Sequence, residues 1–261
     1  MIISNQTELN RYQDLTKLST QILRQLYDAI RVGVTPLEID RLADQLIKKN
    51  HVQAAFKGVG QPLNPYCFAT CISVNEVVVH GIPNERPFQQ GDIIKVDFGI
   101  KADGLITDHC FSVGITPMSA SDEKLLKVSL QAVKEASQLA IAGKTTGDLG
   151  FAQEMVILKG GCNVAKGYIG HGIGHTMHDD PQLPAYGQKR SGEYLVEGMV
   201  LCVESQVLAG EDDLELAADG WTIKTKDGSK AGMFEVMVVV GRKRPIILTP
   251  TLDWPIIKQQ A

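Results

Sequence analysis

The sequence predicts an α+β fold in which helices pack on mainly antiparallel strands. Four segments repeat apolar residues every three or four positions, and the segments between them contain short β-rich runs bounded by turn residues. The order helices, strands, helices, strands thus occurs twice, although no residue-level repeat accompanies it. No low-complexity stretch or charge block marks a linker, so we expect residues 1–261 to form a single domain.

The helical segments have recognisable ends. Residues 7–32 place apolar side chains on one face of a helix that Gly33 ends. The next helix begins with an N-cap at Thr35, a proline at the first helical position and a capping-box glutamate at Glu38, and it runs to about Asn50. Two more helices are expected over residues 121–142 and 147–160.

Strands are expected in two regions of the chain. The first is residues 66–113, where residues 77–79 and 93–98 are β-rich runs separated by turn residues. The second comprises residues 199–207 and 233–240, which are almost wholly apolar. Strands of this composition have at least one buried face.

Composition narrows the classes of protein. A net charge of -4, from 26 basic and 30 acidic residues, gives no reason to expect nucleic acid or an anionic membrane surface as a partner. The five cysteines are odd in number and scattered, which predicts reduced thiols. Residues 1–8 lack the basic start and apolar run of a secretory signal, and no apolar stretch reaches about 18 residues. We therefore expect a cytoplasmic protein.

A pair of aspartates in a predicted hairpin is the first chemical signal. Asp97 lies near the end of one run and Asp108 lies in the return segment, residues 105–113. A four-residue loop at 101–104 would place the two aspartates directly opposite each other. A two-residue loop at Asp103-Gly104 would instead place Asp97 opposite Cys110 and diagonal to Asp108, on the same sheet face. Either register brings two carboxylates together, and a cation between them would offset their repulsion.

Histidines and glutamates supply the second signal. Residues 170–181 (GHGIGHTMHDDP) hold three of the six histidines, His171, His175 and His178, between glycines that allow close approach of a ligand. Glu204 and Glu235 lie within apolar strands, where a charged residue is seldom buried unless it is paired or bound to metal.

These carboxylates and one imidazole together predict a metal site. Hard oxygen ligands with one imidazole suit divalent Mn, Fe, Co or Zn, and a carboxylate between two ions is a common way to hold a hydrolytic metal pair. A carboxylate-rich phosphatase of another fold would hold its metal ions with the same kinds of ligand. It would not explain the glycine-histidine segment or residues 219–222.

Several motifs resemble type I methionine aminopeptidase over about residues 7–249. They are the spacing of Asp97 and Asp108, His178, and residues 71–83 (CISVNEVVVHGIP), 170–174 (GHGIG) and 219–222 (DGWT). The resemblance implies the pita-bread fold, in which two similar α/β halves enclose a dinuclear metal centre. Residues 1–261 would then be a single metallopeptidase catalytic domain, acting as a monomer on the N-terminal peptides of nascent proteins, including those at the ribosome.

The resemblance also assigns roles to individual residues. Asp108 and Glu235 would bridge two divalent ions (Co, Mn, Fe or Zn). The full set of metal ligands implied is Asp97, Asp108, His171, Glu204 and Glu235.

Substrate and proton-transfer roles follow from the same resemblance. Glu204 would move the proton of the attacking water, His80 would contact the substrate near the scissile amide, and His178 would stabilise the developing oxyanion. The pocket for the methionine side chain would be lined near Tyr66, Cys71, Met177 and Trp221.

Some positions depart from the family pattern. Ser205 replaces a usual proline, Val236 a usual histidine, Met177 a common phenylalanine, and His109-Cys110 the usual small hydroxyl residues. These changes bear on substrate preference and turnover more than on metal binding.

Two alternatives on the same fold remain. One is an Xaa-Pro peptidase or creatinase-like hydrolase, a reading that His175 favours slightly, although such relatives usually carry an added N-terminal domain for which this chain has no room. The other is a non-enzymatic binding protein of pita-bread shape. Such proteins generally lose metal ligands, whereas all five expected ligands are present here.

Overall fold

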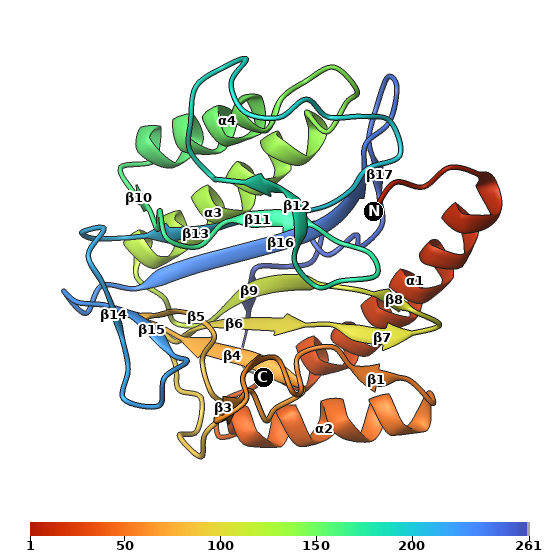
Figure 1. Ribbon diagram of the computed structural model, residues 1–261. Coiled ribbons are helices and arrows are strands. Elements are labelled where there is room, and N and C mark those ends of the chain that lie inside the picture. The colour runs from red at the N-terminus through yellow and green to blue at the C-terminus, as the bar shows by residue number, and fades with distance from the viewer. Residues whose placement is uncertain (260–261) are drawn as a thin grey trace.

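The computed structural model describes residues 1–259 and contains one large curved sheet with helices packed against it (Figure 1). Within these residues the helices are α1 (Gln6–Ala29), α2 (Pro36–Lys49), α3 (Ala120–Gln138) and α4 (Thr146–Lys159). Neighbouring strands along the main path of the sheet are antiparallel. The predicted α+β class with mainly antiparallel strands is confirmed.

The large sheet takes strands from both halves of the chain. Its order in space is β12 (Asp179–Leu183), β11 (Gly170–Gly172), β13 (Val200–Leu208), β16 (Ala231–Val239), β9 (His109–Ile115), β6 (Ile93–Phe98) and β4 (Thr70–Val74). Three short strands join this path at its sides: β10 (Asn163–Val164), β17 (Ile246–Ile247) and β18 (Ile257–Lys258). The central β16–β9 contact thus joins the halves. That residues 1–261 form a single domain stays a prediction.

Smaller sheets surround the large one. One pairs β1 (Gln53–Ala54), β7 (Ile100–Ala102) and β8 (Leu105–Ile106); another pairs β14 (Leu214–Leu216), β15 (Ile223–Thr225) and β5 (Val77–Val79); a third pairs β2 (Gly60–Gln61) with β3 (Asn64–Pro65). The second of these brings residues near 77 and 223 together, although they are far apart in the chain.

The helices form where the sequence predicts them, with small differences at their ends. The capping box of α2 is present: the Thr35 side chain accepts from the Glu38 backbone, and the Glu38 carboxylate accepts from the Thr35 backbone. The third helix ends at Gln138 and not at Ala142. The segment after it leaves the helix because the backbone N–H of Ala142 donates to the carbonyl of Gly241 beside the large sheet.

The two helix pairs lie on different parts of the sheet (Figure 1). Helix α3 packs on β13 and β16, with α4 beside it, whereas α1 and α2 lie near β6 and β4. The main hydrophobic cluster takes buried side chains from α1, α2 and the central strands. The outer face of the sheet is therefore covered by helices, and the inner face is free to carry polar groups.

The hairpin around Asp103 adopts the two-residue loop. Ala102 pairs with Leu105, and Asp103 and Gly104 have φ values of 50° and 76°, as a type I′ turn requires. Asp97 accordingly lies opposite Cys110 and not opposite Asp108. Of the two registers that the sequence allowed, the structure adopts the second.

Two further properties concern the whole chain. All five cysteines are free thiols, and Cys67 alone among them is exposed. Among residues 1–259, no helix combines the length and apolar character needed to cross a membrane.

Asp40 ties helix α2 to the first residues of β4. It is buried, and its Oδ1 accepts hydrogen bonds from the backbone N–H groups of Ala69 and Thr70 and from the Thr70 hydroxyl, at 2.8–2.9 Å. Strand β4 pairs with β6, which carries Asp97. The position of that carboxyl group thus depends on this buried anchor.

We expect Asp40→Ala to lower the free energy of unfolding by about 1–3 kcal/mol, because it leaves buried donors without an acceptor. Asp40→Asn keeps an oxygen in the same place and should lose less. Urea unfolding followed by circular dichroism measures both variants. Equal losses for the two would show that the acceptor oxygen is not what stabilises this junction.

Candidate metal centre

Strand register aligns the side chains of five neighbouring strands in one row. Glu204 on β13 pairs with Glu235 on β16, Glu235 pairs with Cys110 on β9, Cys110 pairs with Asp97 on β6, and Asp97 pairs with Cys71 on β4. Residues directly opposite each other point to the same face of a sheet. Three acidic and two thiol side chains therefore share one row on the inner face.

A second row lies two residues further along the same strands. His171 on β11 pairs with Cys202 on β13, and Cys202 pairs with Met237 on β16. Cys202 precedes Glu204 by two residues, and Asp108 precedes Cys110 by two, so the alternation of a strand turns both toward the same face. The five residues predicted as metal ligands lie in these two adjacent rows.

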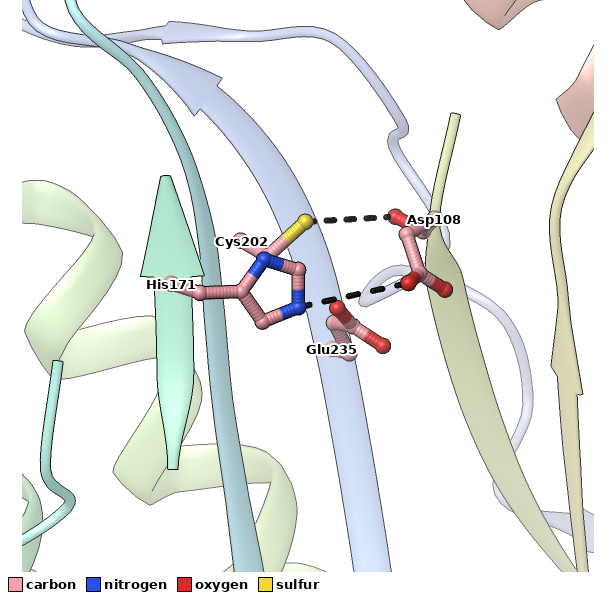
Figure 2. A group of neighbouring side chains, drawn as sticks. All are labelled: Asp108, His171, Cys202 and Glu235. Atoms are coloured by element: carbon pink, nitrogen blue, oxygen red, sulfur yellow. Dashed lines mark hydrogen bonds and ion pairs between the residues drawn. The ribbon is translucent and has the colours of Figure 1, made fainter. Parts of the chain in front are cut away.

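Side chains from the two rows bring their donor atoms into one compact group. His171 Nε2 lies 4.0 Å from Asp108 Oδ2 and 3.9 Å from Glu204 Oε1. Figure 2 shows Asp108, His171, Cys202 and Glu235 turned toward one another, with one donor atom from each within 4.8 Å of the others. A single cation placed among these atoms would be within reach of all of them.

The carboxyl groups of this site repel one another. Burial, and then the charges of the neighbouring carboxylates, raises the pKa of Asp108 and of Glu235 well above the ordinary range, and the pKa values of Asp97 and Glu204 are raised in the same direction, mainly by burial. Two like charges about 5 Å apart at an effective dielectric of 20 repel by roughly 3–4 kcal/mol. Within residues 1–259, no lysine or arginine forms an ion pair with any of the four.

Unpaired oxygens show where a cation fits. Asp97 Oδ1, Asp108 Oδ1 and Glu235 Oε1 are buried atoms without a hydrogen-bond partner. A buried carboxylate oxygen without a partner is costly, and a bound cation removes that cost. The residues present therefore fit a divalent metal ion.

His171 is prepared to donate its Nε2 lone pair. Its Nδ1 lies 2.9 Å from the carbonyl oxygen of Gly172, an arrangement that fixes the proton on Nδ1. Burial lowers the pKa of this imidazole to about 4, so it is neutral at neutral pH. Carboxylate oxygens with one neutral imidazole suit divalent Mn, Fe, Co or Zn.

Gln206 orients the carboxyl group of Glu204. The Gln206 side-chain amide donates to Glu204 Oε2, and Glu204 Oε1 faces His171. Gln206 lies two residues beyond Glu204 on β13, on the same face of the strand. Sequence reasoning did not single out Gln206 or Cys202, although the two-residue period of a strand, applied from Glu204, would have found both.

A cavity of about 110 Å³ opens beside the acidic row. Tyr66, Cys71, Met177 and Trp221 all line this cavity, together with Phe56 and Val59, which the sequence did not reveal. That it is the pocket for the methionine side chain stays a prediction. The complete lining is Phe56, Val59, Tyr66, Cys71, His80, Asp97, Asp108, Met177, His178 and Trp221. Ligand pockets for whole drug-sized molecules have about 300–1,000 Å³, so this cavity suits one side chain.

Two histidines, His80 and His178, line this cavity. The ring of His178 meets that of His171 edge to face, with centroids 4.6 Å apart, and His80 lies 6.4 Å from Trp221. His80 has φ of 56°, a left-handed conformation that costs free energy for a residue with a Cβ and often marks functional positions. Burial, and next His178, lowers the pKa of His80 to about 4, and burial lowers that of His178.

The other two histidines of interest lie outside the site. His109 is buried and its Nε2 lies 2.8 Å from the hydroxyl of Ser19 on α1, on the opposite side of the sheet from Asp108. His175 is exposed, and its Nδ1 lies 2.8 Å from the carbonyl of Gly104. Of the clustered histidines, only His171 and His178 reach the acidic rows.

Comparison with known proteins gives a consistent result. The family model of metallopeptidase family M24 matches residues 10–242. A methionine aminopeptidase from Clostridium acetobutylicum is 36% identical over 250 residues, covering 95% of this chain and 98% of the relative. A crystal structure of methionine aminopeptidase from Thermotoga maritima has a TM-score of 0.90 and 34% identity, covering 95% of this chain and 99% of that chain.

The same fold occurs in a more distant protein. Xaa-Pro dipeptidase from Bacillus anthracis has a TM-score of 0.74 at 18% identity, covering 98% of this chain and 64% of that chain. At this identity the likeness concerns the fold alone. Together with the closer structure it confirms the pita-bread fold that the sequence motifs implied.

We expect a divalent cation to stabilise the wild-type protein far more than Asp97→Asn. At a hundredfold excess of free Mn²⁺ over its Kd, a ligand that binds only the folded state adds about 2.7 kcal/mol. Without metal, Asp97→Asn should be at least as stable as wild type, because one repelling charge is gone. Thermal unfolding with a chelator and then with Mn²⁺ measures both effects.

Asp103→Asn is the matched control, because Asp103 lies in the exposed turn of the same hairpin. It should gain as much stability from the metal as wild type does. If Asp97→Asn gained equally, Asp97 would not be a ligand.

Proposed function

The chain belongs to metallopeptidase family M24 and, within it, to the methionine aminopeptidases, and from this premise we propose that it removes the N-terminal methionine from proteins and peptides. The observation that supports this most directly is the cluster of four carboxyl groups and one imidazole beside a cavity for one side chain. Membership of the family implies dependence on divalent metal ions. The number and identity of the ions are part of the proposal.

We propose Asp97, Asp108, His171, Glu204 and Glu235 as the metal ligands. Glu235 lies between Glu204 and Cys110 in the first row, Asp108 lies 4.0 Å from His171, and each carboxylate has a buried oxygen without a hydrogen-bond partner. These features support a bridging role for both between two ions. Co, Mn, Fe and Zn all suit these donors.

Bound cations would supply Lewis acidity, lowering the pKa of water from 15.7 towards about 7 and polarising the peptide carbonyl. Glu204 takes the proton from the attacking water and passes it to the leaving amine. The hydrogen bond from Gln206 holds Glu204 in one orientation for both transfers.

His80 and His178 act on the substrate amide. Both are neutral at neutral pH because burial lowers their pKa values, so each ring has one N–H to donate. His178 donates to the carbonyl oxygen as negative charge develops there, a contribution of roughly 3 kcal/mol in comparable sites. His80 contacts the substrate near the amide that is cleaved.

The cavity beside the acidic rows holds the methionine side chain. Tyr66 and Trp221 meet edge to face with centroids 5.1 Å apart, and Met177 and Cys71 add polarisable sulfur to the wall. Soft, apolar walls suit a thioether. We also propose that the protein is a cytoplasmic monomer that meets nascent chains at the ribosome.

Metal-free protein should release no methionine from the peptide Met-Gly-Met-Met, and added Mn²⁺ or Co²⁺ should restore release. Asp97→Ala should abolish it, because a ligand is lost. Amino-acid analysis of the products measures the reaction, with Xaa-Pro peptides as the alternative substrates. Cleavage of Xaa-Pro peptides in place of Met-Gly-Met-Met would refute the methionine specificity.

His178→Ala should lower kcat by about 10²–10³-fold, the loss typical of one oxyanion donor. His175→Ala is the matched control, since His175 lies three residues away in the same segment but its ring contacts the carbonyl of Gly104 and does not line the cavity. Its kcat should stay near wild type. Steady-state kinetics on one methionyl peptide separates the two, and a loss in His175→Ala as large as that in His178→Ala would count against the assigned role.

A further inference from the structure

We infer that Cys202 is a sulfur ligand of the metal centre, so that this chain prefers a thiophilic divalent cation such as Zn²⁺, Co²⁺ or Fe²⁺ to Mn²⁺. The inference deepens the proposed function, because it requires the metal centre proposed above. It adds one donor that the resemblance to methionine aminopeptidases does not assign. Strand register, burial and unpaired donor atoms support it.

Register places Cys202 within the donor set and not at its edge. In the second row it lies between His171 and Met237, and along β13 it is two residues from Glu204. Its side chain therefore points to the face that carries the carboxyl groups. Figure 2 shows the sulfur atom turned toward Asp108, beside the ring of His171.

Distances agree with coordination. Donor atoms of Asp108, His171, Cys202 and Glu235 all lie within 4.8 Å of one another. A metal binds thiolate sulfur at about 2.3 Å and nitrogen or oxygen at about 2.0–2.2 Å, so two donors of one ion lie up to about 4.5 Å apart, close to the separations of these donor atoms. Cys202 Sγ also lies 3.9 Å from the carbonyl oxygen of Asp108, a long and weak hydrogen bond that coordination would replace.

The neighbours of Cys202 independently point to a cation. Asp108 and Glu235 are 5% and 2% exposed, and each has a carboxylate oxygen with no hydrogen-bond partner. One carboxylate oxygen of each residue lies within 4.8 Å of the sulfur atom, and Figure 2 shows both carboxyl groups beside it. Among cations that carboxylates and imidazole accept, a thiolate donor selects the softer ones.

Cys110 provides a contrast on the same sheet face. It is buried between Asp97 and Glu235 in the first row, but its sulfur lies 3.6 Å from the carbonyl oxygen of Phe111 and 3.9 Å from that of Met233. Its sulfur is not among the clustered donor atoms of residues 1–259. A position two residues from an acidic ligand is thus not enough to make a cysteine a metal ligand. Cys110 therefore serves as the control for Cys202.

Binding of the cation through Cys202 exchanges a proton for a metal ion. The S–H bond of the thiol breaks, its proton leaves for solvent, and the sulfur lone pair forms the bond to the cation. No oxidant or reductant takes part.

The test is a Co²⁺ titration of the metal-free full chain, followed by absorbance. Cys67→Ser serves as the background throughout, because Cys67 is the exposed thiol. The background protein should develop a near-ultraviolet sulfur-to-cobalt charge-transfer band as Co²⁺ binds. The band should be lost when Cys202→Ser is added and kept when Cys110→Ser is added.

Metal preference provides a second readout. Competition with a chelator measures the affinities for Zn²⁺ and Mn²⁺. Cys202→Ser should lower the ratio of the Zn²⁺ affinity to the Mn²⁺ affinity by at least about tenfold, because the lost donor is soft. Cys110→Ser should leave the ratio of the two affinities unchanged. An unchanged ratio in Cys202→Ser would overturn the inference.

X-ray absorption of the Zn²⁺-loaded background protein needs no Cys202 variant, so it decides the matter even if Cys202→Ser fails to fold. A sulfur scatterer at about 2.3 Å supports the inference. Bound metal with only oxygen and nitrogen neighbours overturns the sulfur ligand and leaves the proposed aminopeptidase intact. Failure to bind any divalent metal overturns both.

Discussion

The mutual repulsion of four clustered carboxyl groups, three of them buried and that of Asp97 half-buried, is the constraint on which the rest of the structure depends. Antiparallel pairing from β13 through β16 and β9 to β6 puts Glu204, Glu235 and Asp97 in one row, with Asp108 in the next. The long strand pairings of the large sheet and the helices packed on its outer face hold these groups together against that repulsion. A divalent cation offsets it, so folding of the inner face and metal binding stabilise each other.

The residues proposed to contact the substrate lie in a different kind of structure from the metal ligands. The ligands lie on or directly beside strands of the large sheet, whereas His80 and His178 lie in irregular segments at its rim. His80 keeps a left-handed backbone, and His178 packs against the ring of a ligand. Rigid strands suit fixed coordination distances, and segments at the rim suit a substrate that must enter and leave.

The departures from the family pattern fall into two groups once the fold is known. His109 points away from the site to Ser19 on α1, so its change from a small hydroxyl residue concerns helix packing. Cys110, its neighbour in the chain, points to the inner face beside carboxyl groups. Alternation along a strand thus decides which substitutions reach the metal centre, because neighbouring residues face opposite sides of the sheet.

The sequence by itself determined the element types, the capping box of α2 and the residues suited to metal binding, because local periodicity and motif spacing are properties of adjacent residues. It left two hairpin registers open for Asp97 and did not reveal Gln206, Cys202 or Phe56. Tertiary structure decided these, since β13 pairs with β16, and β16 pairs with β9, whose residues are more than a hundred positions away in the chain. No local pattern encodes which residues such pairing brings into contact.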